Sequence, residues 1–156
     1  MIELREAKSA ADYNIALQLF QEYAEGLGFD LSFQNFAEEL ANIAQQYATP
    51  TGALLIVFQD ETHPLACAGV KNLENTVCEL KRMYVRSEAR GQGIGKMLLE
   101  KAIVTARELG YKKMRLDTLP SMQAAISLYQ AMGFYEIEAY RFNPFPNARY
   151  FELVLH

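Results

Sequence analysis

Residues 90–96 combine glycines with basic side chains in a spacing that suits the binding of phosphate groups. The segment reads Arg90, Gly91, Gln92, Gly93, Ile94, Gly95 and Lys96, between a predicted strand and a predicted helix. Glycine lets the backbone turn sharply and approach a ligand closely. The free amides at the start of a helix carry a partial positive charge, which attracts anions. The segment therefore predicts a phosphate-binding loop.

Two common phosphate-binding motifs do not match this loop. A Walker A motif needs glycine where Arg90 stands and serine or threonine where Met97 stands, and a nucleotide-binding switch is therefore disfavoured. A dinucleotide-binding motif would need its third glycine at Lys96 or Leu98. A turn that merely connects two elements is also disfavoured, because each glycine costs roughly 0.5–1 kcal/mol in chain entropy.

The pattern R-x-x-G-x-G after a strand, joined by a second motif, resembles the GNAT superfamily of acyl-CoA N-acyltransferases. The first motif covers residues 79–95. The second motif, residues 125–134, reads A-I-S-L-Y-Q-A-M-G-F and is similar to the family pattern A-x-x-L-Y-x-x-x-G-F. The resemblance extends over nearly the whole chain, with the two motifs in the family's order.

The resemblance implies an α/β (α+β) fold with a mixed, mostly antiparallel central sheet of about seven strands flanked by four helices. It implies acetyl-CoA or a close acyl-CoA as the acyl donor, and no metal. We expect an N-acetyltransferase that transfers the acetyl group to a primary amine of a small molecule, or of a peptide, by direct attack in a ternary complex. The alternative is a non-catalytic module that binds acyl-CoA as a sensor or regulatory partner.

The resemblance also assigns residues to the cofactor. The diphosphate would lie on the main-chain amides of the glycine loop, and the pantetheine arm would pair with the strand before it. A main-chain N–H of that strand can polarise the thioester carbonyl. Where Met122 stands many members carry asparagine, so Ser121 either takes over that contact or only caps a helix. The implied cofactor-binding residues are Met83, Tyr84, Val85, Arg90, Gly91, Gln92, Gly93, Ile94, Gly95, Lys96 and Ser121.

Two residues are implied to catalyse the reaction. Tyr129 matches the family's tyrosine and would protonate the departing thiolate, whereas from helical spacing alone it would be a core aromatic. Glu79 is the candidate general base, because the family often places an acid on this strand. The alternative for Glu79 is an exposed residue paired with a neighbouring cation.

Fewer sequence features point to the residues that bind the acceptor amine. Asp117 ends a predicted strand and is a second candidate base, or it caps the following turn. Arg82 and Arg141 can hold a substrate carboxylate bidentately, unless they are simply surface arginines. A loop rich in aromatics and proline, residues 138–147, and residues 28–36 are the expected acceptor walls. The predicted substrate-binding residues are Arg82, Asp117, Arg141 and Asn143.

Hydrophobic periodicity predicts the elements that must position these residues. Predicted strands cover residues 1–6, 53–59, 65–73, 76–85, 114–118, 134–137 and 150–155. Predicted helices cover residues 9–26, 33–47, 94–109 and 121–132, with Ser9 and Asp12 forming a capping box and Ser121 capping the last helix. A meander followed by a strand, loop, helix and strand implies a mixed sheet with helices on both faces.

Length and composition agree with one N-acetyltransferase domain over residues 1–156, with 51% hydrophobic and 22% charged residues. The net charge of −4 argues against nucleic acid or an anionic membrane as partner. The chain shows no apolar run near the ~20 residues of a membrane span, and its start lacks an export signal. Two isolated cysteines and no Cys/His cluster indicate a cytoplasmic protein without a metal site. A homodimer is expected by analogy with the superfamily.

Overall fold

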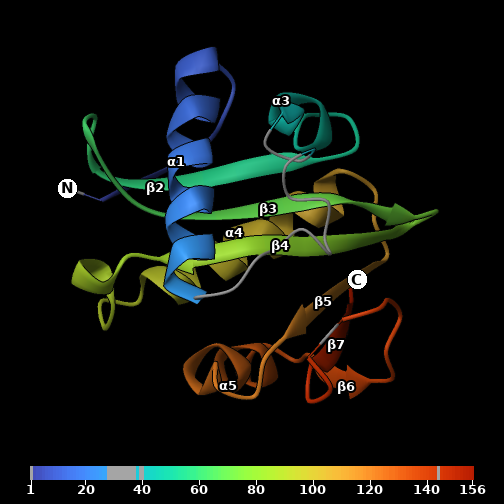
Figure 1. Cartoon of the computed structure of the whole chain (residues 1–156). Helices are drawn as coiled ribbons and strands as arrows, with labels where there is room; N and C mark the ends of the chain where they lie inside the picture. The colour runs from blue at the N-terminus through green and yellow to red at the C-terminus, as the bar shows by residue number, and fades with distance from the viewer. Residues whose placement is uncertain (1, 28–37, 39–40, 144) are drawn as a thin grey trace.

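A seven-stranded sheet forms the centre of the computed structural model, which describes residues 2–27, 38, 41–143 and 145–156 (Figure 1). Its strand order is β1-β2-β3-β4-β5-β7-β6. The strands are β1 (Glu3–Glu6), β2 (Ala53–Asp60), β3 (His63–Glu74), β4 (Val77–Val85), β5 (Lys113–Thr118), β6 (Tyr135–Ile137) and β7 (Arg149–Val154). The helices are α1 (Ala10–Leu27), α3 (Ile43–Gln46), α4 (Ile94–Glu108) and α5 (Gln123–Ala131), with a short 3-10 turn η2 (Ser87–Ala89).

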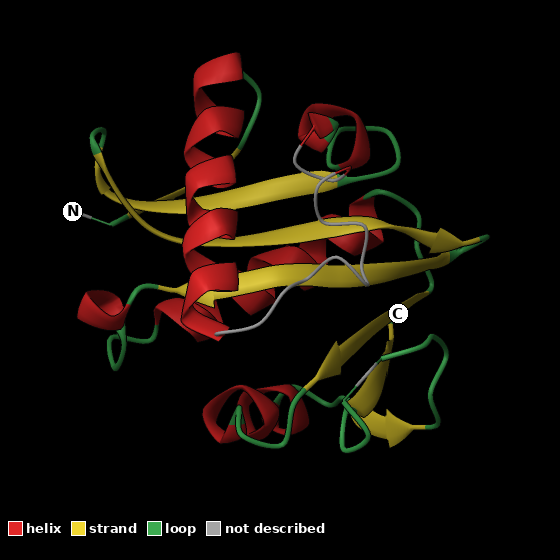
Figure 2. Cartoon of the chain, in the orientation of Figure 1, coloured by secondary structure: helices red, strands yellow, loops and turns green. Residues whose placement is uncertain are grey.

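Strand β2 shows why the sheet is buried on both faces. Its side chains alternate between two hydrophobic clusters: Leu55 and Val57 pack with α4, whereas Leu54, Ile56 and Phe58 pack with α1 and α3. Figure 2 shows α1 in front of these strands and α4 behind them. The predicted mixed sheet with helices on both faces is confirmed.

The sheet opens between β4 and β5. These strands are parallel neighbours and pair only from Val77↔Lys113 to Glu79↔Arg115. Beyond that point β5 turns away from β4, as Figure 1 shows, while β4 continues beside β3 to Val85. The second half of β4 therefore has its edge turned toward the opening, where the pantetheine arm is expected to pair.

A β-bulge interrupts β4 beside this opening. Cys67 pairs with Tyr84 but Gly69 pairs with Lys81, so β4 carries one residue more than β3. Arg82 lies in the bulge with a left-handed φ of 55°, which is uncommon for a residue other than glycine. Bulges re-aim the side chains around them.

The start of α1 follows the predicted capping box. The Asp12 amide donates to Ser9 Oγ at 3.1 Å, and the Ser9 amide donates to Asp12 Oδ2 at 3.4 Å. The predicted cap at Ser121 is wrong, because α5 begins at Gln123 with Met122 as its N-cap and without a side-chain cap. The Met122 amide donates to the Leu119 carbonyl, so a turn occupies the residues before the helix.

Of the predicted helix 33–47, the structure describes residues 38 and 41–47, which include α3, while residues 28–37 and 39–40 lie outside the described part. The predicted acceptor wall at residues 28–36 also lies outside it. Cys67 and Cys78 are buried and form no disulfide. No helix among the described residues has the length and apolar character needed to cross a membrane.

Candidate active site

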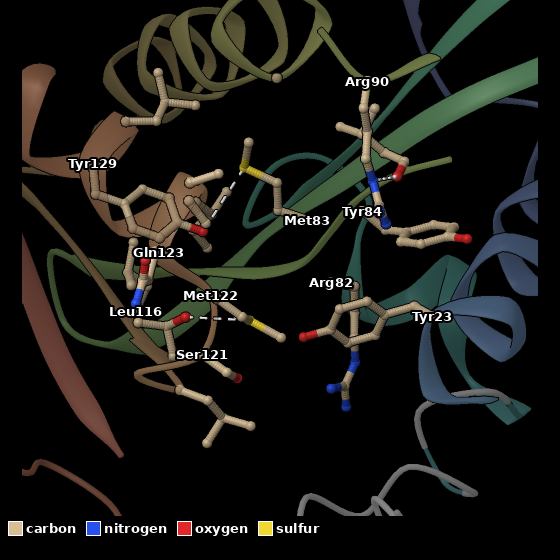
Figure 3. Close-up of a pocket in the computed structure, with 18 of the residues that line it drawn as sticks. Tyr23, Arg82, Met83, Tyr84, Arg90, Leu116, Ser121, Met122, Gln123 and Tyr129 are labelled. Atoms are coloured by element: carbon tan, nitrogen blue, oxygen red, sulfur yellow. Dashed lines mark hydrogen bonds between the residues drawn. The ribbon is translucent and has the colours of Figure 1, made fainter. Parts of the chain in front are cut away.

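A cavity of about 600 Å³ fills the opening between β4 and β5 (Figure 3). It is bounded by the second half of β4, the glycine loop, the start of α4, the end of β5 and α5. The end of α1 and the loop before β7 complete the wall. The predicted site residues that line it are Arg82, Met83, Tyr84, Val85, Arg90, Gly91, Gly93, Ile94, Gly95, Asp117, Ser121, Tyr129 and Asn143.

The glycine loop presents main-chain amides to this cavity. Gly91 and Gly93 have left-handed φ values of 81° and 77°, and Gly93 is the N-cap of α4. The Met97 amide donates to the Gly93 carbonyl at 3.1 Å, so the amides of residues 94–96 precede the first intrahelical bond. A Cβ at Gly91 or Gly93 would meet no atom within 4 Å, so the space beside these two Cα atoms is open. These residues therefore fit an anionic diphosphate.

Arg90 lies at the rim of this loop. It is exposed, and its Nε donates to the Val85 carbonyl at 3.1 Å. That contact draws a positive charge toward the mouth of the loop, where an anion would approach. It also means that the Val85 carbonyl faces the loop side of β4.

Tyr129 combines a packing role with a hydroxyl that faces the cavity. Its ring lies 5.6 Å from that of Phe134 and 6.4 Å from that of Phe151. The hydroxyl points toward Met83 Sδ at 4.0 Å, across the cavity in Figure 3. Burial raises the pKa of this phenol well above its ordinary value, so the group keeps its proton. A buried O–H in this place can donate a proton.

Glu79 is fully buried and holds the loop before β7. Its Oε2 accepts a hydrogen bond from Tyr140 Oη at 2.7 Å, and its Oε1 accepts one from Arg141 Nη2 at 2.7 Å. Burial, followed by the charge of Glu79, raises the pKa of the Tyr140 phenol. Neither Glu79 nor Arg141 is among the described residues that line the cavity.

Three charged residues line the acceptor side of the cavity, namely Lys81, Arg82 and Asp117. Lys81 and Arg82 are each only 5% exposed, and Asp117 faces the same cavity. Burial lowers the pKa of the Lys81 ammonium to about 8. Asn143 Nδ2 approaches Asp117 Oδ2 at 3.4 Å and links the loop before β7 to the end of β5. Lys81 was not predicted, because a lysine on a strand is normally exposed.

A second feature not predicted from the sequence fixes the end of α1 over the cavity. Glu22 accepts hydrogen bonds from Tyr84 Oη at 2.7 Å and from Arg86 Nη2 at 2.9 Å. The next residue, Tyr23, lines the cavity and packs edge-on against Tyr84, with ring centroids 5.9 Å apart. The Arg86 hydrogen bond lowers the pKa of the Glu22 carboxyl. The ion pair thus anchors an aromatic wall opposite α5.

Known proteins share this arrangement. Over the full length of both chains, an acetyltransferase of the GNAT family from Staphylococcus aureus Mu50 superposes with a TM-score of 0.82 at 22% identity. An acetyltransferase from Salmonella typhimurium, solved with its cofactor acetyl-CoA, superposes with a TM-score of 0.72 at 17% identity over 99% of this chain and 94% of that one. At these identities the likeness concerns the fold.

Sequence relatives are closer. An N-acetyltransferase of Schizosaccharomyces pombe, itself uncharacterized, is 38% identical over 153 residues, which are 97% of this chain and 94% of that protein. YjgM, an uncharacterized N-acetyltransferase of Escherichia coli, is 33% identical over 78% of this chain and 72% of its own. The model of the acetyltransferase (GNAT) family matches residues 15–134. The chain therefore belongs to the GNAT family of acetyltransferases.

Proposed function

We propose that this acetyltransferase transfers an acetyl group from acetyl-CoA to the primary amine of a small molecule by direct attack in a ternary complex. One observation carries the proposal: the cavity between β4 and β5 has the amides of the glycine loop on one wall and the Tyr129 hydroxyl on another. The anion-binding loop can hold the diphosphate of coenzyme A, and the protonated phenol can give its proton to the departing sulfur of the thioester.

Bound acetyl-CoA would supply the thioester carbon that the amine attacks. The amides of residues 92–96 hold the diphosphate, and Arg90 adds its charge. The main chain from Met83 to Val85 lies along the open edge of β4, where the N–H of Tyr84 or Val85 stabilises the developing oxyanion. Tyr129 donates its proton to the departing sulfur. Ser121 lines the cavity near α5 and contacts the pantetheine arm.

The amine must lose a proton, and two carboxylates are candidates for accepting it. Glu79 remains the predicted base from the resemblance, yet it already accepts from Tyr140 and Arg141. Asp117 belongs to the cavity wall, which supports it as the residue that meets the amine. We propose Asp117 as the direct acceptor of the proton, and Glu79 as the residue that positions Arg141.

The variants Asp117→Asn and Glu79→Gln separate these roles by their pH profiles. We expect Asp117→Asn to lower kcat by about 10²-fold at neutral pH, the low end of general-base effects. The loss should shrink at high pH, because the acceptor then arrives as the free amine. Glu79→Gln should lower thermal stability and shift KM without this pH-dependent recovery. Recovery seen with Glu79→Gln instead would make Glu79 the base.

The acceptor side favours a small molecule. Among the described residues, Tyr23, Asn143 and Phe145 bound the cavity on that side, and they enclose a space suited to a small amine. The fold itself does not choose, since one structural neighbour is named a phosphinothricin N-acetyltransferase and another a ribosomal-protein-S18-alanine N-acetyltransferase. We also propose a cytoplasmic location, supported by two cysteines that form no disulfide, and a homodimer by family analogy.

The direct test measures thiol release from acetyl-CoA with a panel of small primary amines, and calorimetry measures acetyl-CoA binding in parallel. We expect saturable thiol release that depends on the amine, with a 1:1 acetylated product by mass spectrometry. Binding of acetyl-CoA without acetylation of any amine or N-terminal peptide would refute the catalytic proposal. Absence of binding at millimolar acetyl-CoA would refute the assignment of the glycine loop.

A further inference from the structure

We propose, on the basis of the acetyl transfer proposed above, that Glu22 is a positioning residue for the reaction. Glu22, Tyr84 and Arg86 form a cluster, called the clamp below, which ties the end of α1 to the end of β4. The clamp sets the distance between the acceptor wall, which Tyr23 carries on α1, and the thioester held along β4. It therefore governs the use of the amine rather than the binding of acetyl-CoA.

The first support is the geometry around the Glu22 carboxylate. Its Oε1 accepts hydrogen bonds from Tyr84 Oη at 2.7 Å and from Arg86 Nε at 3.0 Å, and its Oε2 accepts one from Arg86 Nη2 at 2.9 Å. A guanidinium and a carboxylate joined by two parallel hydrogen bonds fix their mutual orientation as well as their distance. The clamp therefore holds α1 at a defined place on β4.

The second support is that Arg86 is itself fixed to the sheet. Its Nη1 donates to the Pro64 carbonyl at 2.9 Å, and its main-chain amide donates to the Leu65 carbonyl at 2.9 Å. Both acceptors belong to β3, and Arg86 directly follows the last residue of β4. The sheet is thus the fixed side of the clamp, and α1 is the element that the clamp positions.

The third support is Tyr84, which connects the clamp to the segment proposed to hold the thioester. Along the end of β4, Met83 and Val85 pack with the cluster beneath α4, whereas Tyr84 packs with the cluster beneath α1. In Figure 3 the Tyr84 hydroxyl points away from Tyr129, toward α1. Burial, followed by the hydrogen bond to Glu22, raises the pKa of the Tyr84 phenol to about 12, so this hydroxyl stays a donor. The residue proposed to stabilise the oxyanion through its main chain thus has its side chain in the clamp.

The fourth support is the aromatic wall that the clamp holds. Tyr23 follows Glu22 on α1, lines the cavity and packs edge-on against Tyr84, with ring centroids 5.9 Å apart. In Figure 3 the Tyr23 ring enters the cavity from the side opposite Tyr129. Tyr23 adds to burial in raising the pKa of the Tyr129 phenol, so the two phenols interact across the space between them. An amine that attacks the thioester in this space lies against Tyr23.

The exposure of the clamp separates positioning from stability. The side chains of Arg86 and Glu22 are 22% and 38% exposed, and neither residue is among the described residues that line the cavity. Ion pairs at exposed sites contribute little to folding. A misplacement of about 1 Å, in contrast, can slow a reaction by about 10²-fold. We therefore expect loss of the clamp to affect acetyl transfer more than stability.

The test replaces Glu22 by glutamine, which has nearly the same shape but lacks the charge and one acceptor oxygen. We expect Glu22→Gln to lower kcat/KM for the amine by at least about tenfold, with the acetyl-CoA Kd unchanged. The matched control is Glu136→Gln, because Glu136 accepts two hydrogen bonds from Arg149 at 3.0 and 2.8 Å. Neither residue of this pair is among the described residues that line the cavity. Both variants should lower Tm by no more than about 2–4 °C, and only Glu22→Gln should lower kcat/KM.

A double-mutant cycle shows whether Glu22 acts through the clamp. Tyr84→Phe removes the hydroxyl that donates to Glu22 and keeps the ring that packs against Tyr23, and it is the second variant if Glu22→Gln fails to fold. Residues that act through one contact have non-additive effects. We expect the double variant to lose clearly less kcat/KM than the product of the two single losses. A double loss equal to that product would refute the clamp.

The assay measures thiol release from acetyl-CoA with the fastest amine of a panel that contains glycine, glycinamide, phenethylamine and spermidine, and calorimetry gives the acetyl-CoA Kd. Wild-type kcat/KM in a folded Glu22→Gln variant, or an equal loss in Glu136→Gln, would overturn the clamp while leaving acetyl transfer intact. If the wild type binds acetyl-CoA but acetylates no amine, the proposed function fails, and the role of the clamp fails with it.

Discussion

The Tyr129→Phe variant is expected to lose roughly 10²-fold or more in kcat while its Kd for acetyl-CoA stays unchanged. Phenylalanine keeps the ring that packs against Phe134 and Phe151, so the walls of the cavity stay in place. The hydroxyl faces a weak acceptor, Met83 Sδ at 4.0 Å, and its removal costs little stability. What the variant loses is the proton that Tyr129 would give to the departing sulfur.

A matched control uses a second buried tyrosine. Tyr111 is 7% exposed, donates its hydroxyl to the Thr51 carbonyl, and is not among the described residues that line the cavity. Tyr111→Phe should cost about 1 kcal/mol of stability for the lost hydrogen bond and leave kcat unchanged. Because burial raises the pKa of Tyr129, this phenol should stay protonated near pH 10, and the wild-type kcat should not fall there through its ionisation. Wild-type kcat in a folded Tyr129→Phe variant would remove Tyr129 from the chemistry.

Local rules predicted the elements that carry the site. Strand β2 was predicted from the uninterrupted aliphatic run at residues 53–58, which is typical of a strand that is buried on both faces. In the structure the side chains of this run alternate between two hydrophobic clusters. The capping box of Ser9 and Asp12 depends on residues three apart, and such contacts form within one turn. The glycine loop was predicted for the same reason, since its conformation follows from residue types in one short segment.

Contacts between residues far apart in the chain could not be predicted from the sequence. Glu79 binds Arg141, which lies 62 residues later in the chain, and Glu22 binds Arg86, which lies 64 residues later. Neither contact can be predicted from local spacing. The bulge at Arg82 depends on how β4 registers against β3, and its own residues give no sign of it. The burial of Lys81, which is 5% exposed, is likewise a tertiary property. The acceptor pocket was therefore less predictable than the cofactor loop, because its charges come from separate strands and loops.

Substitution of Gly93 by valine is expected to weaken acetyl-CoA binding by roughly 10²-fold, through the diphosphate contacts alone. Gly93 combines a φ of 77° with open space beside it, and it caps the helix whose first amides face the cavity. A valine side chain would stand in that space and strain the backbone, which keeps an anion from reaching the amides of residues 94–96. Losing two charge-assisted hydrogen bonds of about 1.5–3 kcal/mol each accounts for an effect of this size or larger.

The control for Gly93 lies at the other end of the same helix. Gly110 follows α4 with a φ of 94°, and a Cβ there would also meet no atom within 4 Å. Gly110→Val therefore imposes the same class of backbone strain, about 1–2 kcal/mol, at a carbonyl end that does not attract anions. We expect the two variants to lose similar stability in thermal unfolding, with acetyl-CoA affinity, measured by calorimetry, falling only for Gly93→Val. Equal affinity in the two variants would show that the diphosphate binds elsewhere, because strain alone would then explain every effect at Gly93.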